Sequence, residues 1–223
     1  MQIPNSWKLV GLVGFVAGVT IGLSTPVMAE LKPAELVKAL QSGGHVVYMR
    51  HTRTDKSQED LDHTNLSNCA TQRNLSEEGR EQARVIAEAI KKLNIDFESV
   101  VTSPYCRARD TADLTFGGGE NSNALRYLSH QPENERSSSI QEIVRMLSTP
   151  PTNGGNTVLV SHTENLKQTA GIWPKDSGTM HIFKPKGNDS YEHLGKINPG
   201  DWPDLAKQAG SADEQSCLWV LCW

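Results

Sequence analysis

Arginine and histidine side chains stand directly after apolar runs at widely separated places in the 223-residue chain. Arg50 and His51 follow the first run, Arg107 lies shortly after the second, and His162 follows the third. A guanidinium group matches a tetrahedral oxyanion through two parallel hydrogen bonds, and a neutral imidazole is a nucleophile. Together these side chains would form a site for a phosphate-like anion.

The three apolar runs, residues 45–49, 99–102 and 157–161, have the length and composition of buried strands. In an open parallel sheet, ligands bind beyond the carboxyl ends of the strands. We therefore expect the three strand ends, and the basic residues that follow them, to converge on one crevice.

The remaining elements alternate between helices and strands. Helices are expected at residues 33–41, after a Ser76 cap, and at 105–114, 140–147 and 164–171; further strands are expected at 125–128, 179–183 and 191–197. This alternation predicts an α/β fold with a mostly parallel sheet and helices on both faces. Residues 55–73 are polar and without periodicity, which predicts a long loop, and loops of that length are often functional.

These motifs resemble those of the histidine phosphatase superfamily, which includes phosphoglycerate mutases and histidine acid phosphatases. The matching segments are Arg50-His51-Thr52 for the family's Arg-His-Gly, residues 103–108 for its Ser-x-x-x-Arg-Ala, and Ser161-His162 for its late Ser-His. The resemblance covers residues 46–173. It implies a three-layer α/β/α sandwich like that of phosphoglycerate mutase.

The resemblance also implies roles for the basic residues. His51 is the expected nucleophile, and Arg50, Arg107 and His162 are expected to hold the phosphate. A covalent phosphohistidine would form on His51, and water would hydrolyse it in a second step.

The leaving group needs a proton, so a carboxylic acid is expected in the site. The phosphoglycerate mutase-like branch uses a Glu between the second arginine and the late histidine, and Glu133 and Glu135 lie in that interval. The acid phosphatase branch uses an acid directly after the late histidine, where this chain has Thr163 and then Glu164. Glu133 is the first choice, followed by Glu135 and Glu164, and a solvated surface position is the alternative for each.

Two residues depart from the family pattern. Thr52 replaces the usual Gly, which would be strained if that position required a positive φ; its hydroxyl could also reach the phosphate. Arg53 lies one place nearer His51 than the additional arginine of the acid phosphatase branch. It either binds substrate or faces solvent.

Residues 1–29 are expected to be a signal peptide, with one charged residue, Lys8, an apolar run and small residues before a cleavage point at Ala29. The alternative is an uncleaved membrane anchor. Cleavage would leave residues 30–223 as a single domain with a C-terminal tail, exported to the periplasm or secreted, without stable membrane insertion. Loss of Lys8 changes the formal net charge from −4 to −5, so no nucleic-acid partner is expected.

The four cysteines would then lie in an oxidising compartment, which favours disulfides. The short loop between Cys217 and Cys222 makes that pairing easy and leaves Cys69 with Cys106, which would tie the Arg107 segment to the loop 55–73. Free thiols at some of these positions are the alternative.

The expected function is hydrolysis of small-molecule phosphate monoesters. A zinc site is not expected, because the seven histidines include no His-Glu-x-x-His pattern and no close pair. The expected reaction uses no metal or other cofactor. Two alternatives stay open: a phosphate-binding or regulatory domain of the same fold with little turnover, and a phosphomutase that returns the phosphoryl group to a second hydroxyl.

Overall fold

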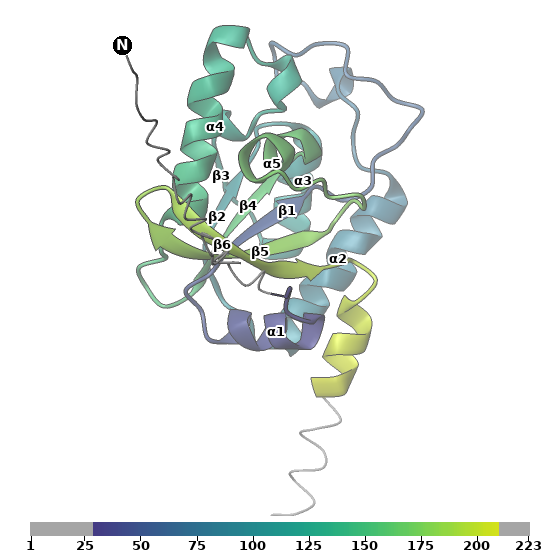
Figure 1. The fold of residues 1–223 in the computed structure, drawn as a ribbon. Helices are drawn as coiled ribbons and strands as arrows, with labels where there is room; N and C mark the ends of the chain where they lie inside the picture. Colours follow the sequence, from purple (N-terminus) through teal and green to yellow (C-terminus); the bar gives the residue numbers. More distant parts are fainter. Residues whose placement is uncertain (1–28, 210–223) are drawn as a thin grey trace, which may run out of the picture.

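A six-stranded sheet forms the centre of the computed structural model, which describes residues 29–209 (Figure 1). Its strands are β1 (Val46–Arg50), β2 (Phe97–Thr102), β3 (Glu120–Asn121), β4 (Asn156–Ser161), β5 (Met180–Gly187) and β6 (Ser190–Ile197), in the order β3-β2-β4-β1-β5-β6. The first four strands pair in parallel, whereas β5 and β6 are antiparallel. The prediction of a mostly parallel sheet is confirmed.

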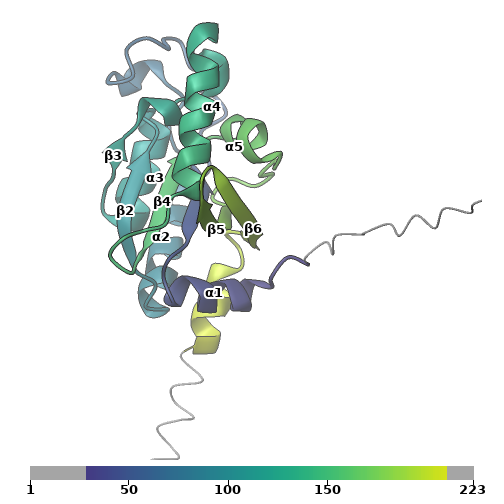
Figure 2. The same cartoon turned by 60° about the vertical axis from the view of Figure 1, so that its left-hand side comes forward.

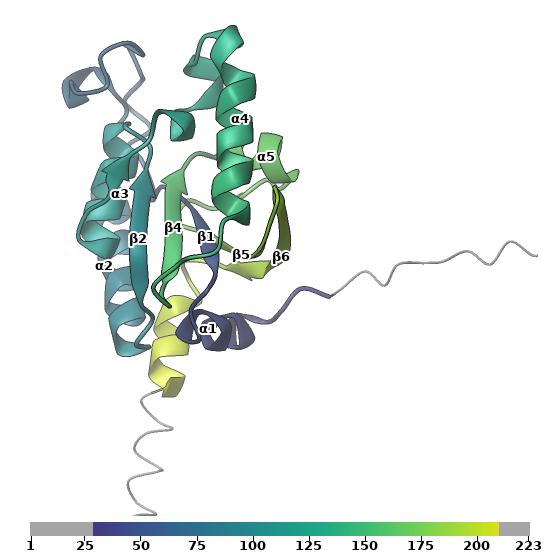
Figure 3. The ribbon, with the colours of Figure 1, turned by 90° about the vertical axis from the view of Figure 1, so that its left-hand side faces the viewer.

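Helices cover both faces of this sheet, which gives the three expected layers (Figures 2 and 3). The helices are α1 (Pro33–Gln41), α2 (Glu77–Lys92), α3 (Cys106–Phe116), α4 (Glu133–Ser148) and α5 (Thr163–Ala170), and residues 202–209 are also helical. Helices α4 and α5 pack on one face, and the other helices pack on the opposite face.

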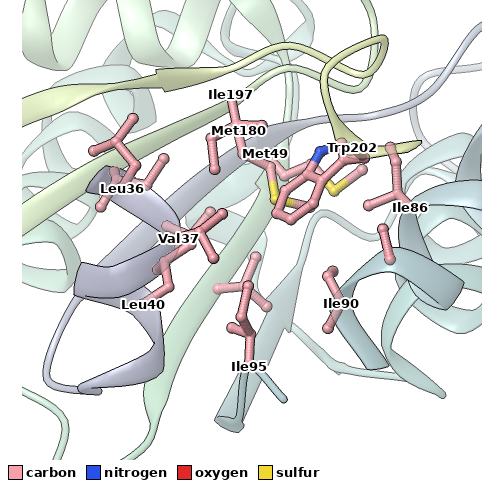
Figure 4. Packing of buried hydrophobic residues seen from close by; sticks show 14 of the residues in the cluster. Leu36, Val37, Leu40, Met49, Ile86, Ile90, Ile95, Met180, Ile197 and Trp202 are labelled. Atoms are coloured by element: carbon pink, nitrogen blue, oxygen red, sulfur yellow. The ribbon is translucent and has the colours of Figure 1, made fainter. Parts of the chain in front are cut away.

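Alternation of side chains along β1 divides the core into two clusters. Val47 and Met49 point toward α1 and α2, where Trp202 closes the cluster (Figure 4). Val46 and Tyr48 point toward α4 and α5. Successive residues of a strand face opposite sides of a sheet, so an unbroken apolar run such as β1 is what a strand covered on both faces requires.

Most predicted elements are present, but the prediction of a strand at residues 125–128 is wrong. Two 3₁₀ turns, Asn123–Leu125 and Leu128–His130, replace it, and Leu125 and Leu128 are buried as single anchors. The edge of the sheet is instead completed by β3. Helix α4 begins at Glu133 rather than at Ile140. The sequence did not reveal its first two turns, because they are polar and exposed and carry no apolar periodicity.

The ends of the chain lie outside the described residues. The predicted leader up to residue 28 and the tail from residue 210, with Cys217 and Cys222, are therefore still predictions. Within residues 29–209, no helix is long and apolar enough to cross a membrane.

Candidate active site

The three strand ends that carry the basic motifs lie side by side in the sheet. Strand β4 lies between β1 and β2, with Ser161 opposite Arg50 and Val160 opposite Thr102. Beyond these ends lies a cavity of about 470 Å³. The four side chains Arg50, His51, Arg107 and His162 all line it.

His51 is buried, and one hydrogen bond determines its tautomer. Its Nδ1 lies 2.8 Å from the carbonyl oxygen of Thr52. Because a carbonyl oxygen can only accept, Nδ1 carries the proton and Nε2 carries the lone pair. Burial, followed by the positive charges of Arg107 and Arg50, lowers the pKa of His51 well below its ordinary value. A neutral imidazole with a free Nε2 is the form required of a nucleophile.

Both motif arginines are anchored through one nitrogen. Nη1 of Arg50 donates to the carbonyls of Pro174 and Lys175, at 3.2 and 2.6 Å. Nη1 of Arg107 donates to the carboxylate of Asp60 at 2.9 Å. In each guanidinium the Nε is buried without a hydrogen-bond partner among residues 29–209. Nε and Nη2 therefore remain as a fork of donors for an anion.

His162 completes the set from the end of β4. The ring is buried, its Nε2 lies 2.8 Å from the hydroxyl of Ser103, and its Nδ1 has no partner in the described chain. The hydroxyl of Tyr48 donates to the His162 carbonyl at 2.7 Å, which fixes the backbone where β4 ends. Burial is the main reason that the pKa of His162 lies well below its ordinary value. The two histidine rings, His51 and His162, are 5.4 Å apart between centroids.

The long loop 55–73 forms one side of the cavity. The predicted disulfide between Cys69 and Cys106 joins it to the first residue of α3. Gln72 adds a second connection: its Oε1 accepts from the Cys106 N–H at 2.9 Å. That backbone donor at the start of α3 is therefore engaged with Gln72 rather than free for an anion.

Five cavity-lining residues come from this loop: Gln58, Glu59, Asp60, His63 and Arg73. Of these, His63 stacks on His130, which also lines the cavity, with ring centroids 3.6 Å apart. Asp60 and Arg73 were missed. Their only sequence signal was the presence of charged residues in a functional loop.

Asp60 and Arg107 form a buried ion pair at the cavity wall. Their side chains are 11% and 2% exposed, and the Asp60 carboxylate also accepts from the Arg73 N–H at 2.9 Å. Burial alone would raise the pKa of Asp60, but the Arg107 guanidinium and these hydrogen bonds hold it below its ordinary value. Asp60 is therefore ionised and positions Arg107.

The three glutamates considered as proton donors lie elsewhere. Glu133 and Glu135 are exposed in the first turn of α4. The Glu164 carboxylate accepts from the N–H and hydroxyl of Ser129, at 2.9 and 2.7 Å. None of the three lines the cavity, whose carboxylates come from the loop 55–73.

Thr52 and Arg53 also lie outside the cavity lining. Thr52 is buried without a positive φ, and its hydroxyl lies 3.2 Å from that of Thr111, so the replacement of Gly causes no backbone strain. Arg53 is exposed, and its carbonyl accepts from the Ser76 N–H. A Cβ at Gly79 would lie 1.9 Å from that carbonyl oxygen, so only glycine allows α2 to approach the chain this closely.

No metal site is evident in the described part of the chain. Between residues 29 and 209, no group of three or more His, Cys, Asp or Glu side chains is placed to hold a metal ion.

Comparison with known proteins agrees with this geometry. The sequence profile of the histidine phosphatase superfamily (branch 1) matches residues 46–122, and no curated protein matches the chain. A solved structure from Escherichia coli K-12, assigned as an alpha-ribazole-5'-P phosphatase, is 15% identical with a TM-score of 0.53, covering 70% of this chain and 98% of that one.

Two further solved structures contain bound anions but have lower TM-scores. The mycobacterial glucosyl-3-phosphoglycerate phosphatase with inorganic phosphate is 16% identical, with a TM-score of 0.48, covering 70% of this chain and 99% of its own. The protein histidine phosphatase SixA with tungstate is 17% identical, with a TM-score of 0.47 and coverages of 70% and 98%. The sequence match makes residues 46–122 similar to the histidine phosphatase superfamily (branch 1), and the chain shares its fold with the solved structure from Escherichia coli.

Proposed function

We propose that this protein is an exported phosphatase that hydrolyses phosphate monoesters through a covalent phosphohistidine on His51. The observation that carries the proposal is the hydrogen bond between His51 Nδ1 and the Thr52 carbonyl, which leaves Nε2 as the nucleophile in a cavity lined by Arg50 and Arg107. The similarity of residues 46–122 to the histidine phosphatase superfamily supports a phosphatase-type activity.

The reaction would proceed in two displacements. In the first, the Nε2 lone pair attacks phosphorus, the bond from phosphorus to the ester oxygen breaks, and the alcohol leaves with a proton from a carboxylic acid. The forks of Arg50 and Arg107 stabilise the equatorial oxygens. In the second, water attacks phosphorus, the phosphorus–nitrogen bond breaks, and inorganic phosphate leaves. The Thr52 carbonyl holds the Nδ1 proton throughout, so His51 returns to its starting tautomer.

The substrate class follows from the cavity. The anion-binding groups share the cavity of about 470 Å³ with Tyr127, His130 and Trp173, and this volume leaves room for a small organic group beside the phosphate.

The proton donor to the leaving group has two sets of candidates. Glu133 is the choice from sequence, whereas Glu59 and Asp60 are the carboxylates that line the cavity. The geometry favours Glu59, because it lines the cavity while the ionised Asp60 has no proton to donate. Because the lowered pKa keeps Asp60 ionised, its suited role is to accept a proton from the attacking water in the second step.

One observation favours a second function, phosphate binding without turnover. Glu133, Glu135 and Glu164, the acids expected from the family pattern, all lie outside the cavity lining. A domain of this fold without an acid would still bind the anion through Arg50 and Arg107.

Hydrolysis of p-nitrophenyl phosphate tests the proposal against this alternative. The wild type should release p-nitrophenol and form an acid-labile phosphoenzyme, and His51→Ala should do neither. His193→Ala, on β6 outside the cavity lining, is the matched control and should retain activity. Phosphate binding with no turnover above that of His51→Ala would support the binding domain.

Export is a separate part of the proposal and rests on residues 1–29. N-terminal sequencing of the protein recovered from the periplasm or medium should begin at Glu30. Recovery of the whole chain from the cytoplasm would contradict export.

A further inference from the structure

Arg73 supplies a third guanidinium to the cavity. Its side chain is partly buried and lines the cavity together with those of Arg50 and Arg107. Its Nε is buried without a hydrogen-bond partner, and no ion pair neutralises it within residues 29–209. A buried charged donor without a partner is costly in a folded protein, so this group is placed to meet a ligand that the cavity receives.

The charges around the cavity also require Arg73. Arg107 is neutralised by its ion pair with Asp60, and the lowered pKa values of the two histidines keep them uncharged. Without Arg73, Arg50 would then supply the only uncompensated positive charge among these groups. A phosphate monoester carries close to two negative charges at neutral pH. With Arg73 the buried groups carry two net positive charges. Glu59 is exposed, and solvent screens its charge.

The backbone of Arg73 is locked to the same ion pair. Its N–H donates to the Asp60 carboxylate at 2.9 Å, and its carbonyl accepts from Arg107 Nη1 at 3.4 Å. Arg73 therefore starts from a fixed position beside Arg107, at the end of a loop that the Cys69–Cys106 disulfide joins to α3. Its charge also contributes to the lowered pKa of His51, which agrees with a position close to the nucleophile.

We propose that Arg73 binds the phosphoryl group directly, as a third guanidinium beside Arg50 and Arg107. This inference rests on the proposed function, because it assigns a further ligand of the same phosphoryl group. The alternative ligand for Arg73 is an anionic group on the leaving alcohol, and a probe that has no leaving group separates the two.

Tungstate and inorganic phosphate are such probes, and isothermal titration calorimetry measures their binding without turnover. Arg73→Gln removes the charge at nearly constant length, and Arg73→Lys keeps the charge but loses the fork. Arg84→Gln is the matched control: it removes one positive charge from the exposed face of α2, where Arg84 contacts Glu77 and Glu81.

We expect the dissociation constant for tungstate to rise about tenfold or more in Arg73→Gln, the effect of losing a charged hydrogen bond. Arg73→Lys should weaken binding by a smaller factor, and Arg84→Gln should stay within about twofold of the wild type. Thermal denaturation of each variant shows whether it is folded; if Arg73→Gln unfolds, Arg73→Lys decides.

Three results would overturn the inference. They are unchanged tungstate binding in both Arg73 variants, unchanged tungstate binding with a raised KM for p-nitrophenyl phosphate, and no tungstate binding by the wild type. A loss of tungstate affinity in Arg73→Gln, combined with no turnover by the wild type, would support the role of Arg73 and refute the phosphatase. Failure of the two proposals is therefore distinguishable.

Discussion

Replacing Asp60 by Asn tests whether the buried ion pair with Arg107 holds the cavity wall together. The amide keeps the size of the carboxylate and one oxygen that can accept, so the hydrogen bonds from Arg107 Nη1 and the Arg73 N–H, both 2.9 Å, lose their ionic character but not their geometry. A hydrogen bond to a charged group contributes about 1 kcal/mol more than a neutral one, so two such bonds give about 2 kcal/mol. The unpaired Arg107 charge would add to this loss.

The assay is thermal denaturation followed by circular dichroism. For a domain of this size each kcal/mol changes Tm by about 2–4 °C, so Asp60→Asn should lower Tm by about 4–8 °C. Asp110→Asn is the matched control, because its ion pair with Arg80 has the same 2.9 Å distance while both side chains are about one-third exposed, at 29% and 35%. An exposed pair contributes about 0.2–1 kcal/mol.

The pH dependence gives a second check. The folded pKa of Asp60 lies below its ordinary value of 3.8, so its stabilisation is fully present above that pH and is lost as the pH falls through the folded value. The Tm difference between the wild type and Asp60→Asn should therefore be constant from pH 5 to 7 and shrink below about pH 4. Equal Tm changes in Asp60→Asn and Asp110→Asn would refute the reasoning.

Four further predictions concern the site. Arg107→Lys keeps the charge but loses the fork, so kcat/KM for p-nitrophenyl phosphate should fall at least about tenfold; near-normal turnover would contradict bidentate binding. Cys69→Ser opens a disulfide that spans 37 residues, so it should destabilise the protein by up to about 4 kcal/mol and raise KM as the loop loosens; unchanged kinetics would count against this role. Because the lowered pKa keeps His51 neutral, kcat/KM corrected for substrate ionisation should stay level as the pH falls through 6.5, and a midpoint at 6.5 would contradict a buried nucleophile. Glu133→Gln should leave the ratio of alkyl to aryl phosphate hydrolysis within about twofold, since its side chain is exposed; a selective loss with alkyl phosphates would restore Glu133 as proton donor.

The sheet and the motif residues could be predicted because their signals are local. The apolar runs of β1 and β4 and the single stripe of α2 follow directly from strand and helix periodicity. Arg50, His51 and His162 stand at strand ends, and parallel pairing brings such ends together whatever the loops do.

Elements without a local period were misread. The polar start of α4 has no apolar stripe, so local periodicity places the start of this helix too late in the sequence. Leu125 and Leu128 resemble the ends of a short strand in sequence, yet each is buried as a single anchor in a 3₁₀ turn. In both places tertiary packing outweighed the local pattern.

The sequence alone determined which ligand the site is suited to bind, because guanidinium groups and an imidazole fit a tetrahedral anion. It also determined their placement, because these residues stand at the ends of neighbouring strands. Only the tertiary structure decided which charges complete the cavity. Asp60 and Arg73 reach it because the Cys69–Cys106 disulfide and the hydrogen bond from Cys106 to Gln72 fold the loop 55–73 against α3. Contacts between residues so distant in the chain leave no periodic pattern in the sequence, so only the folded structure reveals them.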